Sequence, residues 1–112
     1  MADFFGFPVC KPEVAEYLKE EISKKPAYVV SSTYCPYCNK AKNLLKKYGI
    51  DHNELMLDKV EPKEQQAELA NCIYGYNDRF VPFIYLQGKM IGSYGELARM
   101  AQYGQLDGIG EK

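Results

Sequence analysis

The sequence has no apolar stretch approaching the roughly 20 residues that a membrane span needs, and no excess of either charge. Its 14 lysines and arginines nearly balance its 15 aspartates and glutamates, for a net charge of -1. This balance gives no electrostatic reason to expect binding to nucleic acid or to an anionic membrane. The first ten residues contain an acid and no basic cluster, so they are not typical of a secretory signal. We therefore expect a cytoplasmic protein, in which disulfides are usually catalytic or transient.

Histidine and cysteine, the residues that bind zinc, are also few. The chain has one histidine, His52, and four cysteines, of which only Cys35 and Cys38 are close together. Structural zinc needs four ligands, commonly two cysteine pairs or one pair with histidines, so this composition argues against zinc. Cys10 and Cys72 are isolated, and a structural disulfide framework is disfavoured in the expected compartment. We expect neither to be catalytic, with Cys72 a small hydrophobe on a helix and Cys10 exposed.

What is present suits one globular domain spanning residues 1–112, with 46% hydrophobic and 26% charged residues. Residues 1–11 form an irregular extension before the first predicted helix. Its Phe4, Phe5 and Phe7 are expected to cover an apolar edge or to lack order, and a partner-docking patch is the alternative.

Hydrophobic periodicity, prolines and glycines divide the rest of the chain into alternating elements. Helices are predicted at residues 12–24, 36–48, 62–73 and 95–103, and strands at 27–32, 52–58 and, as a hairpin around Gln87 and Gly88, within 80–92. The strand–helix–strand unit predicts two parallel strands joined by a right-handed crossover, and the hairpin adds an antiparallel edge. The predicted fold class is α/β, a three-layer sandwich with a four-stranded mixed sheet and helices on both faces.

The segment Cys35-Pro36-Tyr37-Cys38 falls between the first predicted strand and the helix that follows. Pro36 suits the first helical position, where its missing N–H costs nothing. Cys35 then precedes the positive end of a helix, a place that stabilises a thiolate and lowers the pKa of its thiol. Cys38 lies one turn later on the same side, within reach of a disulfide. This pattern favours thiol–disulfide exchange with Cys35 as nucleophile, over two unreactive helix cysteines.

Val81 and Pro82 open the third predicted strand. A cis bond between them would direct the Val81 backbone N–H and C=O outward, where an extended peptide-like substrate could pair with them. An ordinary proline at the start of a strand is the alternative, because most bonds before proline are trans.

Residues 12–106 resemble a glutaredoxin of the dithiol class, within the thioredoxin-like superfamily. The matching segments are "TYCPYC" (33–38), "VP" (81–82) and "GKMIGSYGEL" (88–97), in the order and spacing of that family. The resemblance implies a thioredoxin-like fold and an enzyme that reduces protein disulfides and glutathione mixed disulfides. Glutathione would be the co-substrate, with no metal or bound prosthetic group. Oxidised or glutathionylated proteins would be the partners of a monomer.

The same resemblance implies a role for each matching position. Cys35 would be the nucleophile and Cys38 the resolving thiol. The glutathione site would be formed by Tyr37, the Val81 backbone, cis Pro82, the turn at Gly92 and Ser93, and Glu96, which would receive the γ-glutamyl end.

The chain departs from the family pattern at several of these places. Ser32 stands where the family commonly has lysine, Phe80 where it has threonine, and Ser93 where it has a second glycine. The missing lysine removes a cation for one glutathione carboxylate unless Arg79 or another basic residue replaces it. The other candidates for that cation are Lys40 and Lys89.

Two other functions stay open on the sequence. One is the same exchange chemistry with a different electron donor, either thioredoxin reductase or another low-molecular-weight thiol, favoured by the departures at Ser32 and Phe80. The other is an iron–sulfur carrier that shares Cys35 and glutathione across a dimer. Pro36 argues against the carrier, because by resemblance cluster carriers usually have a smaller residue there.

Overall fold

The computed structural model describes residues 10–75 and 78–109, in which four strands form one mixed sheet. In the order β2-β1-β3-β4 they are β2 (His52–Met56), β1 (Ala27–Ser31), β3 (Phe83–Leu86) and β4 (Lys89–Gly92). β1 pairs with β2 in parallel and with β3 antiparallel, and β3 and β4 form the hairpin. The α/β fold and the mixed four-stranded sheet predicted from the sequence are confirmed. The predictions for Phe4, Phe5 and Phe7 lie outside the described residues.

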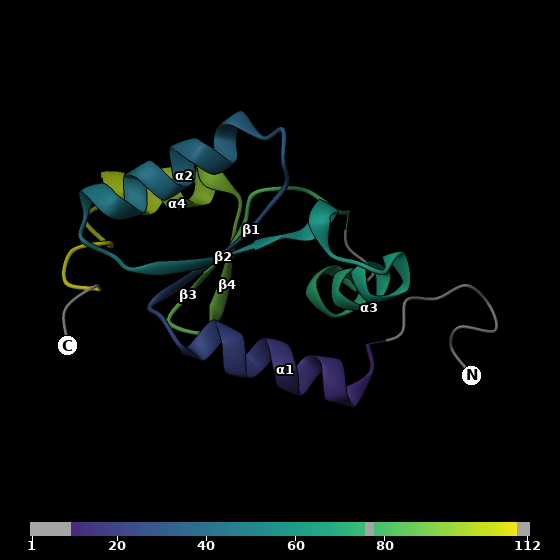
Figure 1. Ribbon diagram of the computed structural model, residues 1–112. Coiled ribbons are helices and arrows are strands. Elements are labelled where there is room, and N and C mark those ends of the chain that lie inside the picture. The colour runs from purple at the N-terminus through teal and green to yellow at the C-terminus, as the bar shows by residue number, and fades with distance from the viewer. Residues whose placement is uncertain (1–9, 76–77, 110–112) are drawn as a thin grey trace.

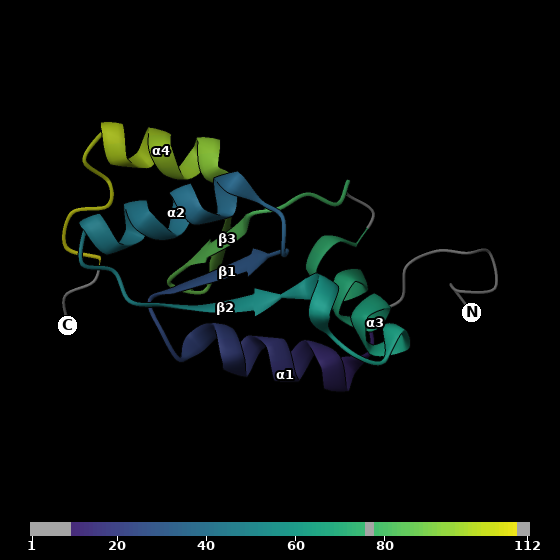
Figure 2. The same ribbon diagram turned by 45° about the horizontal axis from the view of Figure 1, so that its top comes forward.

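Helices cover both faces of this sheet. They are α1 (Pro12–Ser23), α2 (Pro36–Lys47), α3 (Lys63–Tyr74) and α4 (Tyr94–Gln102). Figures 1 and 2 show α2 and α4 together on one face, with α1 and α3 on the other. Each helix lies within one or two residues of its predicted range. The strand predicted at 52–58 is shorter, because the chain turns into a 3-10 helix, η2 (Leu57–Lys59), after Met56.

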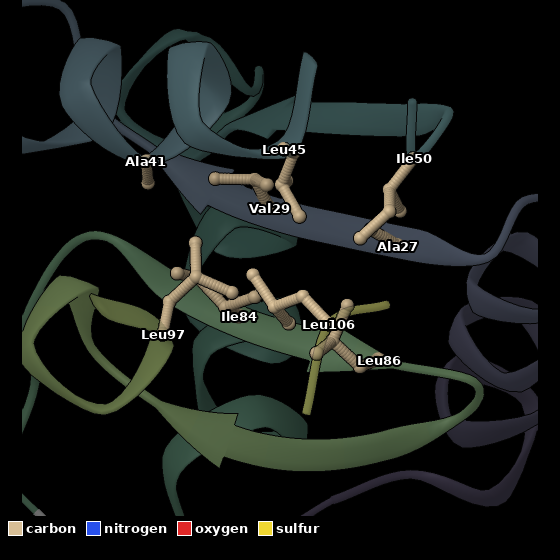
Figure 3. Close-up of a cluster of buried hydrophobic side chains, with 9 residues drawn as sticks. All are labelled: Ala27, Val29, Ala41, Leu45, Ile50, Ile84, Leu86, Leu97 and Leu106. Carbon is tan, nitrogen blue, oxygen red and sulfur yellow. The ribbon is translucent and has the colours of Figure 1, made fainter. Parts of the chain in front are cut away.

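The sheet is buried between two apolar clusters, because neighbouring side chains along a strand point to opposite faces. Val29 of β1 and Ile84 of β3 point toward α2 and α4, whereas Val30 and Phe83 point toward α1 and α3. Figure 3 shows the first cluster: Ala27, Val29, Ala41, Leu45, Ile50, Ile84, Leu86, Leu97 and Leu106. Leu106 lies beyond the last helix and is fully buried in this cluster, with Ile109 packed against it. This packing buries β1 along its whole length, and the loop that follows β1 carries the first cysteine of the pair.

The structure corrects the expectation for the two isolated cysteines. Cys10 and Cys72 form a disulfide across 62 residues of sequence, with Cα atoms 4.5 Å apart. Cys72 is half-buried on α3 rather than a core hydrophobe, and Cys10 is exposed just before α1. The two positions meet because α1 and α3 pack on the same face of the sheet. In the part of the chain that the structure describes, no helix is both long and apolar enough to cross a membrane.

Candidate active site

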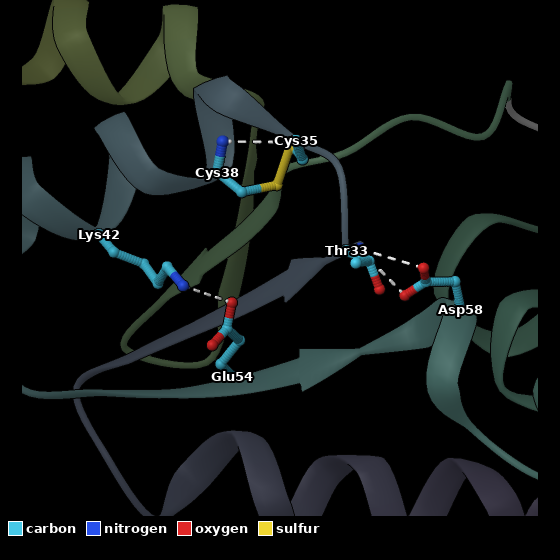
Figure 4. A network of polar contacts seen from close by, with 6 residues as sticks. All are labelled: Thr33, Cys35, Cys38, Lys42, Glu54 and Asp58. Carbon is cyan, nitrogen blue, oxygen red and sulfur yellow. Dashed lines mark hydrogen bonds and ion pairs between the residues drawn. A yellow bond between two sulfur atoms is a disulfide. The ribbon is translucent and has the colours of Figure 1, made fainter.

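The Cys35 and Cys38 sulfurs lie at the junction of β1 and α2 and are joined in a disulfide, with Cα atoms 5.2 Å apart. Cys35 is the N-cap residue of α2 in an extended conformation, and Pro36 is the first helical residue. The backbone N–H of Cys38 donates to Cys35 Sγ at 3.1 Å (Figure 4). Cys35 is partly exposed, whereas Cys38 is 2% exposed and packs with the inner face of α2. The structure therefore places the two sulfurs in unequal surroundings.

This geometry has a direct consequence for the reduced pair. A thiolate at Cys35 would accept the Cys38 N–H, one of the donors that a helix start leaves without an intrahelical partner. The helix dipole also favours negative charge at that end. Both effects stabilise the charged form of Cys35, and such sites lower the pKa of a thiol. Cys38 is buried and bonded to Cys35, which suits a resolving thiol.

The loop that carries Cys35 is anchored to the end of the neighbouring strand. The backbone N–H of Thr33 donates to both carboxylate oxygens of Asp58, at 3.2 and 3.1 Å. The Thr33 side chain, and after it the Thr33 backbone N–H, holds the pKa of Asp58 below its ordinary value. Sequence reasoning missed Asp58. The signal was available, because β1 and β2 are parallel and residues that follow parallel strands meet at one edge of a sheet.

Val81 and Pro82 enter the site from the opposite side. The antiparallel pairing of Val30 with Phe83 continues toward Val81, and the chain leading into β3 runs beside the β1–α2 loop in Figures 1 and 2. The Val81–Pro82 bond is cis. Phe80 takes the place of the family's threonine, and its carbonyl accepts a hydrogen bond from the Tyr74 hydroxyl at 2.5 Å. The structure thus brings Val81 to the edge of the site, with its preceding residue tied to α3.

Tyr37 joins the starts of α2 and α4. Tyr37 is 55% exposed, and its ring lies 5.7 Å, centroid to centroid, from the ring of Tyr94. Lys40 Nζ lies 4.9 Å from the centroid of the Tyr37 ring, a cation–π contact. The pairing of Tyr37 with Tyr94 places the first turn of α4 beside the first turn of α2. The residues expected to bind glutathione from α4 are therefore next to Cys35.

Gly92 ends β4, Ser93 is the N-cap residue of α4, and Glu96 lies in the first turn of α4. Glu96 Oε1 accepts the Ser93 backbone N–H at 2.9 Å and the Ser93 hydroxyl at 2.7 Å. The hydroxyl first, and then the backbone N–H, keeps the pKa of Glu96 below its ordinary value. Gly92 has φ of +120°, and a Cβ there would come within 2.8 Å of Glu96 Oε1. Glycine at 92 is what lets Glu96 fold back over the helix start.

The structure separates the candidates for the missing cation. Lys89 pairs with Leu86, at the end of β3 that is far from Pro82. The prediction that Lys89 could supply the cation missing at Ser32 is therefore wrong. Arg79 Nη2 donates to Asn71 Oδ1 at 3.3 Å on α3. Lys40 remains on the active-site helix beside Tyr37. His52 pairs with Ala27 at the opposite end of β1 from Cys35, so it cannot join the cysteine pair as a metal ligand.

Comparison with known proteins gives consistent matches over this same part of the chain. The glutaredoxin family model matches residues 27–91. Glutaredoxin-1 of Saccharomyces cerevisiae is 31% identical over 97 residues, which cover 85% of this chain and 88% of the yeast protein. The glutaredoxin of Ricinus communis is 35% identical, covering 79% of this chain and 84% of its own.

Solved structures agree with the sequence matches. The holo form of glutaredoxin C1 from Populus tremula x tremuloides superposes with a TM-score of 0.71 at 29% identity, covering 84% of this chain and 91% of that chain. The dithiolic glutaredoxin 2-C-Grx1 of Trypanosoma brucei brucei gives a TM-score of 0.69 at 29% identity, covering 90% and 98% of the two chains.

Proposed function

The chain belongs to the glutaredoxin family of glutathione-linked thiol–disulfide oxidoreductases, and on this premise we propose that Cys35 is its attacking thiolate and Cys38 its resolving thiol. One observation carries the assignment: Cys35 Sγ caps α2 and accepts the Cys38 N–H, while Cys38 is buried beneath it. A partly exposed, stabilised thiolate attacks from solvent, and a buried thiol reacts only within the molecule.

The reaction proceeds in balanced exchange steps. The Cys35 thiolate attacks one sulfur of a protein disulfide, forms a mixed disulfide and releases the other protein thiolate, which takes up a proton. Cys38 loses its proton and attacks Cys35 Sγ, which closes the Cys35–Cys38 disulfide and releases the reduced protein. Two molecules of glutathione then supply the two electrons that reopen the pair and leave as glutathione disulfide. For a glutathionylated protein, Cys35 alone removes the glutathionyl group and one further glutathione regenerates it.

The backbone and the start of α4 are proposed to hold glutathione against Cys35. The Val81 N–H and C=O pair with its peptide backbone as an added extended strand, with Pro82 shaping that edge and the Tyr37 ring flanking it. Gly92 and Ser93 present the turn that receives the γ-glutamyl group. Both hydrogen bonds from Ser93 reach Glu96 Oε1, and we assign the other carboxylate oxygen, Oε2, to the glutamyl ammonium. The glutathione site is thus made largely from backbone groups that side-chain departures do not remove.

The electron donor is tested by comparing two coupled assays on the full chain. Reduction of a small glutathionylated disulfide is followed with glutathione, glutathione reductase and NADPH, and in parallel with thioredoxin reductase and NADPH. We expect turnover in the first assay and little in the second, and no turnover of Cys35→Ser in either. Efficient turnover with thioredoxin reductase, together with no turnover with glutathione, would show that thioredoxin reductase and not glutathione is the electron donor. Failure of Cys35→Ser to lose activity would refute the catalytic assignment itself.

A further inference from the structure

The Cys10–Cys72 disulfide lies on the face of the sheet that bears α1 and α3, whereas the Cys35–Cys38 pair lies at the start of α2, which covers the other face. Cys10 immediately precedes Lys11 and Pro12, which begin α1, and Cys72 lies near the end of α3. Both sulfurs lie 3.9 Å from the Lys11 carbonyl oxygen. The glutaredoxin chemistry assigned to Cys35 and Cys38 gives this second pair no role.

The second pair repeats the asymmetry of the first. Cys10 is exposed and precedes a helix start, where the dipole favours a thiolate. Cys72 is half-buried in the last turn of α3, so an external thiol reaches its sulfur less readily than it reaches that of Cys10. Access therefore favours external attack at Cys10, and Cys72 is suited to internal attack.

A groove leads to the pair along α1. It has a volume of about 420 Å³ and is lined by both cysteines together with Leu18, Lys19, Ile22 and Tyr85, among others. Lys19 places a cation beside an otherwise largely apolar approach to the disulfide. That combination suits a small anionic thiol, whose carboxylates Lys19 would attract while its thiolate reaches the sulfurs.

We propose that Cys10 and Cys72 form a second thiol–disulfide exchange site, at which an anionic low-molecular-weight thiol attacks Cys10 and is later displaced by Cys72. In the opening step the external thiolate bonds to Cys10 Sγ, the Cys10–Cys72 bond breaks, and Cys72 leaves as a thiolate that takes up a proton. In the closing step Cys72 loses that proton and attacks Cys10, which expels the external thiol and restores the disulfide. When both cysteines are reduced, the disulfide form of the same small thiol is the oxidant.

The site is isolated for testing in the full chain carrying Cys35→Ser and Cys38→Ser, so the result does not depend on the proposed catalytic function. The protein is equilibrated with mixtures of reduced and oxidised glutathione, quenched with acid, alkylated and weighed by mass spectrometry. As the fraction of oxidised glutathione rises, we expect Cys10 and Cys72 to change reversibly from two free thiols to one internal disulfide. If glutathione opens the disulfide only after the chain is unfolded, the disulfide is a permanent cross-link and the proposal is overturned. The proposal is also overturned if both thiols stay reduced in every mixture.

The direction of attack is tested by adding Cys72→Ser or Cys10→Ser to that background. With oxidised glutathione, the chain that keeps Cys10 should gain a glutathionyl group about tenfold faster than the chain that keeps Cys72. Equal rates, or a faster Cys72, would overturn the assignment of Cys10 as the attacked sulfur.

Lys19 is tested in the chain that keeps Cys10 and Cys72. Lys19→Gln should slow opening by reduced glutathione severalfold at low ionic strength and leave opening by uncharged 2-mercaptoethanol unchanged. Lys24→Gln is the matched control, because Lys24 directly follows α1, pairs with Glu21 and does not line the groove. If Lys19→Gln and Lys24→Gln behave alike, or if the effect persists with 2-mercaptoethanol, the groove does not select an anionic thiol.

Discussion

The Thr33 backbone N–H and the Asp58 carboxylate join the active-site loop to the end of β2, with both oxygens of Asp58 within 3.2 Å of the Thr33 nitrogen. Thr33 lies two residues before Cys35, so this contact fixes the backbone from which the proposed nucleophile projects. We expect Asp58→Ala to lower kcat/KM for disulfide reduction by roughly two- to fivefold, because a misplaced nucleophile loses rate. Asp58→Asn keeps one acceptor oxygen for the Thr33 N–H, so its kcat/KM should fall less than that of Asp58→Ala. Rates equal to the parent in both variants would show that the loop holds its shape without Asp58.

The same contact predicts a dependence of stability on pH. The pKa of Asp58 is lowered in the folded chain, so its ionised form adds stability that is fully present above its ordinary pKa. That stability is lost as the pH falls through the lower, folded value. The difference in unfolding free energy between the parent and Asp58→Asn should therefore be constant near neutral pH and shrink from about pH 4 downward. Urea unfolding at several pH values measures it, and a difference that grows on acidification would contradict the assignment.

The two active-site cysteines should respond differently to removal. Cys35→Ser should abolish all exchange, because no thiolate remains at the start of α2. Cys38→Ser should retain removal of glutathione from a small substrate, which needs one thiol, and lose most reduction of protein disulfides, which uses two. Alkylation of the reduced parent at about pH 6 should label Cys35 before the other cysteines. Earlier labelling of Cys38 would reverse the two roles.

Ser32 is the position at which a cation should improve glutathione use. We expect Ser32→Lys to lower KM for a glutathione-linked substrate by up to about tenfold, since one charge-assisted hydrogen bond is restored. The gain should be largest at low ionic strength, where the added charge is least screened. Ser32→Gln is the control of similar length without charge. If Ser32→Lys changes nothing, a cation already serves the site, and Lys40→Gln, with Lys40 beside Tyr37, becomes the next variant to measure.

The Cys10–Cys72 cross-link should contribute to stability but not to catalysis. It closes a loop of 62 residues, and the chain-entropy model gives about 4 kcal/mol for a loop of this length. Replacing both cysteines with serine should lower the unfolding free energy of the oxidised protein by an amount of that order, with kcat/KM nearly unchanged. The comparison is made on oxidised chains, and the difference should largely vanish after full reduction. A loss of about tenfold in kcat/KM would reveal a catalytic role that the geometry does not show.

The layout of the proposed catalytic pair was readable from the sequence because its parts are local. Pro36 at the first helical position, a β-branched strand before it and Cys38 one turn later specify a cysteine at a helix start without help from distant residues. The short run of apolar, β-branched and aromatic residues from Ala27 to Val30 likewise predicted a buried strand, and the structure buries it on both faces. These features depend on backbone geometry and side-chain periodicity over a few residues, which sequence carries directly.

Contacts between residues far apart in the chain were decided by the tertiary structure. Asp58 reaches Thr33 because β1 and β2 pair in parallel, and Cys10 reaches Cys72 because α1 and α3 pack on the same face of the sheet. Lys89 is excluded from the site because the hairpin carries it to the far end of β3. Each outcome follows from pairing register and helix packing, where many weak apolar contacts act together and no single residue signals the result. The sequence by itself determined that a cysteine pair capable of thiol–disulfide exchange starts a helix. The tertiary structure determined which distant side chains contact that pair and its loop.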